Sequence, residues 1–530
     1  MSPSIPNFDL SVPPPKIPGD LAANIPLVLA KKVNLSPRKL AEEILSNFPK
    51  TDLVEKMEIA GPGFLNFWMK DSAYRNELND LLAGKKKRSA VPTKEDKFLV
   101  EFVSANPTGP LHVGHGRGAA LGDSLVRVFR YLGYDVTAEF YVNDAGGQIR
   151  NLGLSMEARL KECKGEKADL PEGGYQGAYL VDLAKEALES GNSYESINPA
   201  QMIFSEKDLA GFASKRILKA IQQTLEDFGV HFDHWYFESE LHKKDVISKT
   251  IESLENQKHA YQQDGAYWFR ATDFGDEKDR VLKKTNEAPT YFASDIAYHA
   301  DKFSRGYTKL VNIWGADHHG YAQRLKGALK AINQNQKALE IILNQMVSIK
   351  GGRLSKRAGN MITLKEVVDE VGRDATRFFF SLRSPGSHFE FDLDLAKKQA
   401  SDNPVYYVQY VHARCCSIFR EAEKRKMRTE PLLWASKKTH VPLEEVERAV
   451  LLHMMKFDDV VEICARDFSN HHLPIYLMEL AGKYHSFYEK CRVLEEDETL
   501  RSFRLDLVEA IRKRVEQGLN LLGVGAPERL

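Results

Sequence analysis

One segment of the sequence, Glu101–Gly122, constrains the fold of this chain more than any other, because it predicts a strand, a turn and a helix in succession. Phe98, Val100 and Phe102 alternate with other residues, and this period of two is typical of a strand. A Pro-Thr-Gly-Pro turn ends the alternation, and apolar residues then recur at helical spacing until Gly133. A second alternating stretch follows, so this part of the chain predicts a strand–helix–strand unit.

Two histidines, His112 and His115, fall where the predicted helix begins. The first turn of a helix has free N–H groups and a partial positive charge, so it binds phosphate well. Gly114 and Gly116 are expected to leave room for the base or ribose of a nucleotide, and the imidazoles to donate hydrogen bonds to phosphate oxygens. A glycine-containing turn with two structural histidines is the alternative interpretation, and these four residues alone leave both open.

The same pattern returns in the second half of the chain. Residues 310–314 predict a strand, the sequence Gly-Ala-Asp-His-His-Gly follows it, and a helix is expected up to about residue 332. Residues 341–349 predict another strand, which leads into the glycine-rich basic segment Lys350–Gly359. Two such halves predict a doubly wound parallel sheet, whose ligand crevice lies at the carboxyl ends of the strands. Since both histidine motifs and the basic segment directly follow strands, the sequence predicts a nucleotide site.

Changes in pattern divide the chain into three domains, residues 1–92, 93–400 and 401–530. The first predicts a small α/β domain with a helix over residues 21–32 and a hairpin. The middle domain carries the Rossmann-like sheet, and an insertion is expected at about 151–270, because charged helical stretches replace the strand pattern there. The last predicts an all-α helical bundle, since its apolar residues recur at helical spacing.

Composition argues against some classes of protein. Lys plus Arg and Asp plus Glu both number 74, so the net charge gives no sign of a polyanionic partner, and nucleic-acid binding would need local patches. The basic run Lys85–Arg88 is one such patch, read either as a solvated linker or as a contact to an RNA backbone. No apolar run of about 18 residues predicts a membrane span, and the N-terminus lacks the pattern of a secretory or transit peptide.

The five cysteines lack the spacing of a zinc site and fit a reducing cytoplasm. His231 and His234 are spaced like metal ligands, but no further cysteine or histidine clusters near them in the sequence. No protein-bound metal is therefore expected.

Two motifs together resemble the signatures of the class I aminoacyl-tRNA synthetases. His112-Val-Gly-His115 matches the first, and Arg353-Leu-Ser-Lys356 matches the second, except that arginine replaces its first lysine. The longer run SANPTGPLHVGH is similar to the bacterial arginyl-tRNA synthetases, and this similarity extends over nearly the whole chain. The further matching segments are GDLAANIPLVLAKK near residue 19, Tyr141–Gly146, Tyr291–Asp295, Trp314–Gly320, Asn403–Tyr410 and Ala526–Leu530.

The resemblance implies an arginine–tRNA ligase. In such an enzyme the α-carboxylate of L-arginine attacks the α-phosphate of ATP, giving arginyl-adenylate and pyrophosphate, and the terminal ribose of tRNA(Arg) then takes the arginyl group. Mg²⁺ would accompany ATP as part of the substrate complex. The resemblance also implies a tRNA-binding N-terminal domain, an anticodon-binding C-terminal domain, a cytoplasmic location and a monomer.

By resemblance, His112, His115 and Lys356 are the catalytic residues, because they bring hydrogen-bond donors and positive charge to the phosphorus transition state. Gly114 and Ser355 complete the expected ATP site. No protein nucleophile is required, so catalysis is expected to rest on positioning and electrostatics.

Two positions near these motifs vary within the family. Arg353 can supply positive charge where lysine is usual, but its planar fork differs from a point charge, and its role is left open. Members that lack the loop lysine carry one shortly before the first histidine. Here that earlier position is Gly109, so Lys356 is expected to supply the catalytic lysine alone.

Recognition of arginine calls for carboxylates, because a guanidinium has five donors and prefers planar, bidentate acceptors. The sequence offers Glu101, Asp295 and Asp317 in or after predicted strands, although a surface ion pair or a helix cap is the alternative for each. By resemblance, Tyr291, Asp295 and Asp317 contact the side chain of arginine. The residues expected at the backbone end of arginine are Ser104, Asn106 and His115.

The start of the helical domain is a candidate for contact with tRNA. Tyr406, Tyr410 and Arg414 would stack on or contact unpaired anticodon bases. Tyrosines at helical spacing are as typical of a bundle core, so both interpretations stay open.

Two alternative functions are a cysteinyl-tRNA synthetase and a non-catalytic tRNA-binding protein. The first has a similar sheet and helical domain but needs cysteine and histidine ligands for zinc around the pocket, whereas the cysteines here fall mostly in the bundle. The second would have lost catalysis, and the intact His112, His115 and Lys356 argue against this.

Overall fold

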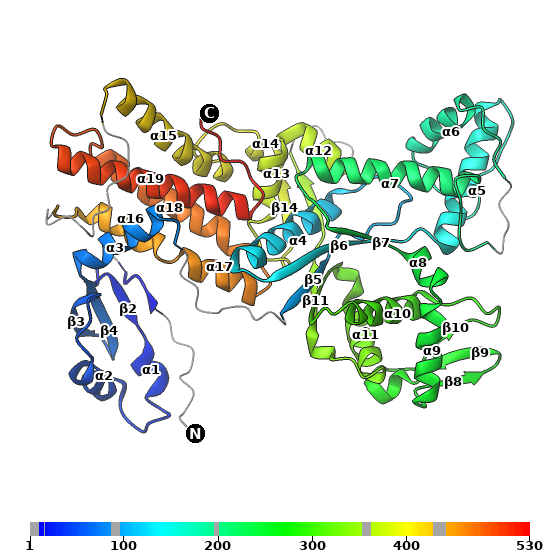
Figure 1. The fold of residues 1–530 in the computed structure, drawn as a ribbon, viewed down its shortest axis with the longest axis horizontal. Coiled ribbons are helices and arrows are strands. Elements are labelled where there is room, and N and C mark those ends of the chain that lie inside the picture. The colour runs from blue at the N-terminus through cyan, green and yellow to red at the C-terminus, as the bar shows by residue number, and fades with distance from the viewer. Residues whose placement is uncertain (1–9, 15, 86–95, 196–200, 352–361, 428–440) are drawn as a thin grey trace.

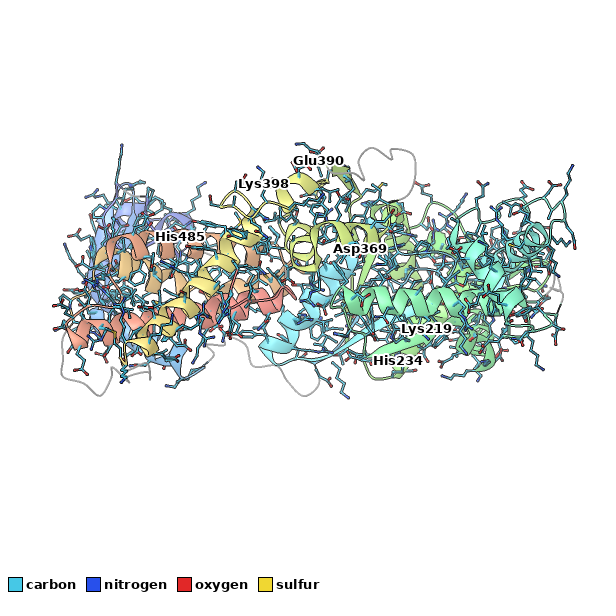
Figure 2. The ribbon with its side chains drawn as sticks, turned by 90° about the horizontal axis from the view of Figure 1, so that it is seen from above. Lys219, His234, Asp369, Glu390, Lys398 and His485 are labelled. Carbon is cyan, nitrogen blue, oxygen red and sulfur yellow. The ribbon has the colours of Figure 1, made fainter. Side chains whose placement is uncertain are left out.

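The structure, a computed structural model, describes residues 10–14, 16–85, 96–195, 201–351, 362–427 and 441–530. It has a small N-terminal domain, a central domain built around a parallel sheet, and a C-terminal helical bundle (Figure 1). Figure 2 shows an elongated molecule, with His485 in the half that contains the bundle and Lys219 and His234 in the other half. The predicted fold class is confirmed.

Among the residues that the structure describes, the central sheet has five parallel strands in the order β12–β11–β5–β6–β7. They are β5 (Lys97–Glu101), β6 (Asp135–Val142), β7 (His234–Phe237), β11 (Lys309–Gly315) and β12 (Leu339–Asn344). The chain builds outward from β5 in both directions, so the strand order reverses between β5 and β11. In a doubly wound sheet, the ligand crevice lies at the carboxyl ends of the strands at this reversal.

Both faces of the sheet are covered, as parallel sheets require. Phe98 and Val100 of β5 belong to the core that includes the apolar side of α4 (Val113–Leu132). Leu99, which points the other way, belongs to a second core that includes α10 (Tyr291–Ser304). The alternation of β5 therefore divides its side chains between the two cores.

Two excursions leave the sheet (Figure 1). The first, between β6 and β7, contains α5 (Gly146–Cys163), α6 (Tyr179–Glu189) and α7 (Leu209–Asp227). The second, between β7 and α10, contains α8 (Glu238–Lys243), α9 (Val246–Asn256) and the antiparallel strands β8 (Ala260–Gln263), β9 (Ala266–Phe269) and β10 (Arg280–Lys283). The expectation of one insertion at 151–270 is therefore corrected, because β7 within that range pairs with β6 in the main sheet. Four aromatic residues in a row show no alternation from which a strand could be predicted.

In its described residues, the N-terminal domain is an antiparallel sheet with three helices. Its elements are β1 (Leu10–Ser11), β2 (Leu21–Ala23), α1 (Ile25–Leu29), α2 (Pro37–Asn47), β3 (Val54–Ala60), β4 (Phe64–Met69) and α3 (Asp71–Leu82). The predicted hairpin is confirmed as β3 and β4. The helix predicted over residues 21–32 is wrong at its start, because β2 pairs there with β4.

The bundle consists of α15 (Pro404–Lys424), α16 (Glu445–Met454), α17 (Phe457–Arg466), α18 (His472–Lys490) and α19 (Glu498–Leu521). The elements that lead to it are α11 (His319–Ala331), β13 (Val347–Lys350), α12 (Leu364–Val371), α13 (Arg373–Phe380), β14 (Phe389–Asp392) and α14 (Leu393–Ala396). The strand predicted over residues 341–349 is in fact parts of β12 and β13, and β13 pairs with β14 outside the main sheet. Within the described ranges, none of the helices is both long and apolar enough to cross a bilayer.

Candidate active site

The turn after β5 has a strained backbone. Val103 and Ser104 have φ angles of 69° and 41°, and the N–H of Ser104 donates to the carbonyl of Phe102 at 3.0 Å. Positive φ is costly for a β-branched residue such as Val103 and persists where surrounding contacts hold it. Here the hydroxyl of Ser104 donates to Glu101 Oε1 at 2.9 Å and accepts from the N–H of Tyr141 at 3.2 Å. These contacts fix the turn at the carboxyl end of β5.

The imidazoles of His112 and His115 cap the first turn of α4. His112 Nδ1 accepts hydrogen bonds from the N–H groups of Gly114 (3.1 Å) and His115 (3.3 Å), and His115 Nδ1 accepts from the N–H of His112 (3.2 Å). The hydrogen-bond pattern therefore assigns each proton to Nε2, the nitrogen left to donate to a ligand. Burial lowers the pKa of both rings, that of His115 to about 3 with a further contribution from His112. Both rings are thus neutral N–H donors at pH 7.

A cavity of ≈ 760 Å³ opens beside the two histidines. Its walls come from the turn between β5 and α4, from residues 175–179 of the first excursion and from the start of α12. Tyr179 joins two of these walls, because its hydroxyl donates to the carbonyl of Thr108. Asn106 also lines the cavity and donates to Gln148 Oε1 at 2.5 Å. The cavity lies against the N-terminus of α4, where a phosphate would be favoured.

Two carboxylates, Glu238 and Asp295, interact electrostatically at the start of α8 and in α10. Burial raises the pKa of each to about 7, and the charge of Asp295 adds to the effect on Glu238. Tyr321 donates its hydroxyl proton to Asp295 Oδ2. The amide of Asn143, oriented with its nitrogen toward Glu238, donates to Oε2 at 2.7 Å. A buried acid, Glu238, and a partly buried one, Asp295, both with raised pKa values, form a site that a cation would stabilise.

Tyr291 interacts electrostatically with the acid pair and with the cavity wall. Burial raises its pKa, and the next contributions come from the charges of Glu238 and of Tyr175, which lines the cavity. Its side chain is nevertheless exposed, since the whole residue is 56% accessible. Tyr291 therefore links the acid pair electrostatically to a residue of the cavity wall.

Three protein-family models match consecutive parts of the chain. They are the arginyl tRNA synthetase N terminal domain over residues 1–69, the tRNA synthetases class I (R) catalytic domain over residues 77–380, and the DALR anticodon binding domain over residues 408–530. The arginine–tRNA ligase of Desulforamulus reducens is 44% identical over 532 residues, covering 99% of this chain and 94% of that protein. The chain belongs to the arginyl-tRNA synthetase family. It is a ligase that activates L-arginine with ATP and transfers it to tRNA(Arg).

Other members of the family and solved structures agree. The arginine–tRNA ligase of Moorella thermoacetica is 45% identical over 533 residues, with 99% of this chain and 94% of that protein covered. The crystal structure of a putative arginyl-tRNA synthetase from Campylobacter jejuni has a TM-score of 0.76 at 37% identity, covering 86% of this chain and 99% of that one. The Thermus thermophilus arginyl-tRNA synthetase has the same TM-score at 23% identity, with 99% and 96% covered, which supports the fold.

The glycines of this arginyl-tRNA synthetase family member do not have the role predicted from the sequence. A Cβ on Gly116 would lie 2.5 Å from Leu364 Cδ1, and one on Gly114 would lie 3.0 Å from His112 Cε1. The space beside both residues is thus filled by protein side chains, so the expectation that they make room for a nucleotide is corrected. Gly116 allows α12 to approach α4, and Gly114 allows the His112 ring to fold over the helix.

The remaining predicted acids lie in different surroundings. Glu101 is buried, and its two carboxylate oxygens contact Ser104 and, at 2.6 Å, the ammonium of Lys302. Asp317 follows β11 with an 82%-exposed side chain, 3.6 Å from His318 Nε2. The structure thus groups Asp295 with Tyr291 and the unpredicted Glu238, while Glu101 lies inside the protein and Asp317 on its surface.

The basic loop lies outside the described residues, and with it Arg353, Ser355 and Lys356. The chain on its far side resumes at Ile362, which lines the cavity and accepts a hydrogen bond from the N–H of Val113 at 3.0 Å. Ile362 therefore adjoins the first turn of α4.

On the bundle, Tyr406 and Tyr410 are partly exposed and lie on one side of α15. The Tyr410 ring lies 5.8 Å from that of His485 on α18, at 28°, and 6.4 Å from that of Tyr406. Arg414, one turn further on, lies over the ring of Tyr488, 4.8 Å from its centroid. Tyr410 is 39% exposed, so it does not belong to the bundle core, and contact of these residues with bases stays a prediction.

The sequence did not predict Glu238, Asn143 or Tyr321. A signal was present only for Asn143, which lies in the matching segment Tyr141–Gly146. Glu238 directly follows β7, and the failure to predict that strand hid its position at the carboxyl edge of the sheet.

Proposed function

We propose how the site divides the work of arginine activation. The turn between β5 and α4 binds ATP and the backbone end of arginine, and Glu238 and Asp295 bind the guanidinium. The acid pair carries this proposal. A guanidinium is a planar cation with five N–H donors, and two carboxylates can accept hydrogen bonds from it. Tyr291 interacts electrostatically with Glu238 and with Tyr175 of the cavity wall, which supports one amino acid spanning both parts.

In the ATP part of the site, His112 and His115 donate from Nε2 to phosphate oxygens. Gly114 belongs to this part because a side chain there would displace the His112 ring. Ser355 and Lys356, on the basic loop, supply the remaining donors, and Lys356 neutralises charge that develops at phosphorus. Mg²⁺ enters with ATP and screens the phosphate charge from the attacking carboxylate.

In the arginine part, Ser104, Asn106 and His115 bind the backbone end, and Tyr291 covers the side chain. Glu101 acts through Ser104, because its carboxylate is already used inside the protein. Asp317 stays a prediction, since among the contacts of the described residues it has none with Glu238 or Asp295.

In this proposal, tRNA contacts the protein from the N-terminal domain to the bundle. Tyr406, Tyr410 and Arg414, with His485 beside them, stack on unpaired anticodon bases. The N-terminal domain binds the outer corner of the tRNA. The enzyme acts as a cytoplasmic monomer.

An ATP–pyrophosphate exchange assay with arginine tests the activity. We expect exchange with arginine only when tRNA(Arg) is present, as the family resemblance predicts. Binding of tRNA(Arg) without any exchange or aminoacylation would instead identify a non-catalytic tRNA-binding protein. Size-exclusion chromatography with light scattering tests the monomer.

A further inference from the structure

Two glutamates lie side by side beneath the proposed arginine site. Glu101 and Glu139 are register partners on β5 and β6, and both side chains are buried. Like charges adjacent in a protein interior are costly unless each has a cation and hydrogen bonds. The structure must therefore supply two positive charges at this place.

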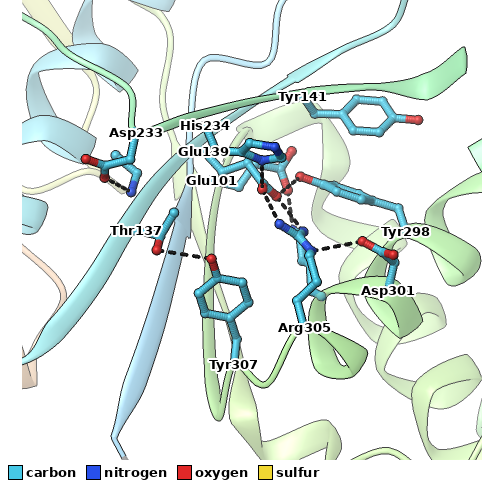
Figure 3. A network of polar contacts seen from close by, with 12 residues as sticks. Glu101, Thr137, Glu139, Tyr141, Asp233, His234, Tyr298, Asp301, Arg305 and Tyr307 are labelled. Carbon is cyan, nitrogen blue, oxygen red and sulfur yellow. Dashed lines mark hydrogen bonds and ion pairs between the residues drawn. The ribbon is translucent and has the colours of Figure 1, made fainter. Parts of the chain in front are cut away.

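The cations come from α10 and its C-terminal cap. Lys302 Nζ lies 2.6 Å from Glu101 Oε2, and Arg305 contacts both oxygens of Glu139, at 2.5 and 3.0 Å. Figure 3 shows the Glu139 half, where Tyr298 also donates to Oε1 at 2.6 Å. Because residues three apart lie on one side of a helix, α10 presents one cation to each strand.

Among the described residues, Lys302 is the one of these two cations that hydrogen bonds link to both ends of the proposed arginine site. These ends are Ser104 and Asp295. From Lys302, one path passes through Glu101 to the hydroxyl of Ser104. The other passes through Asn312 Oδ1, which accepts from Nζ at 3.3 Å. The Asn312 amide then donates to His299 Nε2 at 2.9 Å.

The second path ends at the backbone of Asp295. Since His299 Nε2 accepts, its proton lies on Nδ1, which donates to the Asp295 carbonyl at 2.8 Å. Burial lowers the pKa of His299 well below its ordinary value, so the ring stays neutral and keeps this arrangement. The Lys302 side chain is fully buried, and its ammonium lies 4.2 Å from the ring centroid of Tyr298. Its position is therefore closely fixed.

We propose that Lys302 is a positioning residue that sets the distance between the two ends of the arginine site. Its ammonium holds the Ser104 turn through Glu101 and the Asp295 turn of α10 through Asn312 and His299. The site then accepts a side chain of one length. This inference rests on the proposed arginine site and adds a determinant of specificity to it.

The test compares Lys302→Met with Arg305→Met in aminoacylation assays that use arginine and homoarginine, which is one methylene longer. For Lys302→Met we expect the KM for arginine to rise about tenfold, and the KM for ATP to stay within about twofold. Discrimination against homoarginine, measured as the ratio of kcat/KM values, should fall by at least about threefold, because one methylene in a fixed pocket is worth about 10–200-fold. Arg305→Met also removes a buried cation, and it should lower the unfolding temperature without changing this ratio.

Asn312→Leu is the second variant, because it keeps both charges of the Lys302–Glu101 pair and breaks only the path to His299. Asn312→Leu should raise the KM for arginine about threefold. It should also lower the discrimination against homoarginine, as Lys302→Met does. An unchanged ratio in a folded Asn312→Leu or Lys302→Met protein would overturn the proposal. So would an equal change in Arg305→Met, which would show a purely structural role.

Asp295→Asn separates failure of this inference from failure of the proposed site. If Asp295→Asn raises the KM for arginine and the Lys302 and Asn312 variants do not change specificity, only the role of Lys302 is wrong. If Asp295→Asn has no effect, the arginine site itself is wrong.

Discussion

At the scale of single residues, the proposed arginine site depends on keeping two acids close together in the protein interior. Glu238 and Asp295 both have a pKa of about 7, raised mainly by burial. In the empty site the folded protein therefore binds more protons than the unfolded chain between the ordinary carboxyl pKa and pH 7. The contribution of these groups to stability falls as the pH rises through that window. A bound guanidinium reverses the preference, because it stabilises the ionised acids.

The affinity for arginine should therefore depend on pH. The KM for arginine should fall at least about tenfold between pH 6 and pH 8 and level off above that, since about tenfold is expected for one proton lost from one group of pKa about 7 and both acids have such a pKa. The KM for ATP, measured in the same assays, controls for effects on the phosphate site. Calorimetry of arginine binding in two buffers of different ionisation enthalpy should show proton release at pH 6.5. A KM for arginine that does not vary over this range would contradict the raised pKa values.

Asp295 should matter more for arginine than for ATP. Replacing it in Asp295→Asn removes the charge from one partner of the guanidinium, and a hydrogen bond to a charged group contributes about 1.5–3 kcal/mol. We expect the KM for arginine to rise at least about tenfold and the KM for ATP to stay within about twofold. Asp369→Asn, on the exposed surface of α12, is the matched control. A KM for arginine within about twofold of the wild-type value would exclude Asp295 from the guanidinium site.

At the scale of elements, the active site depends on how closely α4 approaches the strand before it. The helix runs from Val113 to Leu132, and its C-cap Gly133 has a φ of 92°. Along its buried side, Gly122 faces Phe102, where a Cβ would lie 2.2 Å from Cγ of the ring. Since Phe102 precedes the strained turn that carries Ser104, any displacement there would reach both parts of the site.

Gly122→Ala and Gly118→Ala should therefore differ, although both add one methyl group to the same helix. The first must push α4 or Phe102 aside, and overpacking of this kind costs about 1–3 kcal/mol. The second meets only the Asn344 side-chain nitrogen at 3.7 Å, and alanine favours a helix over glycine by about 0.5–1 kcal/mol. We expect Gly122→Ala to lower the thermal unfolding temperature and raise the KM values for both ATP and arginine, whereas Gly118→Ala leaves the KM values unchanged. Equal unfolding temperatures for the two variants would contradict this account.

The elements also show what the sequence could predict. The strand–helix–strand unit around His112 and the bundle helices were predictable, because their periodicity lies within one stretch of chain. β7 was not, since its place in the sheet depends on pairing with a strand far away in sequence. The same limit explains the site: Asp295 was identified by resemblance, but its partner Glu238 becomes a neighbour only when the sheet forms. The burial of Glu101 was also beyond prediction, because its counterion, Lys302, comes from another element.

At the scale of the whole molecule, the end of the chain joins the bundle to the catalytic domain. The hydroxyl of Ser124 on α4 donates to the carbonyl of Leu521 at 2.8 Å. From α15, Gln409 donates to the Gly525 carbonyl at 2.9 Å and His412 Nδ1 to the Pro527 carbonyl at 2.9 Å. The last residues thus lie between the bundle and the sheet domain, so the proposed anticodon surface keeps a defined position relative to the cavity.

Arg377 should be the residue on which this junction depends most. Its fully buried guanidinium contacts Asp123 and donates to the carbonyls of Leu522 at 2.9 Å and Phe228 at 3.1 Å, which joins α13, α4 and the ends of α19 and α7. Arg377→Met removes a donor from the carbonyls of Leu522, Phe228 and Gly229 and from the carboxylate of Asp123, which keeps its contact with Arg127 Nε at 2.7 Å. Breaking a buried pair from one side costs about 3–5 kcal/mol when no other cation remains, so we expect a loss of stability below that range. Calorimetry should show the bundle and catalytic domain unfolding in separate, earlier transitions, where the wild-type protein unfolds in one. Arg373→Met, from the same helix but with a 46%-exposed side chain, should change the unfolding temperature little, because exposed ion pairs contribute only about 0.2–1 kcal/mol. A single transition at the wild-type temperature in Arg377→Met would show that other contacts hold the two domains together.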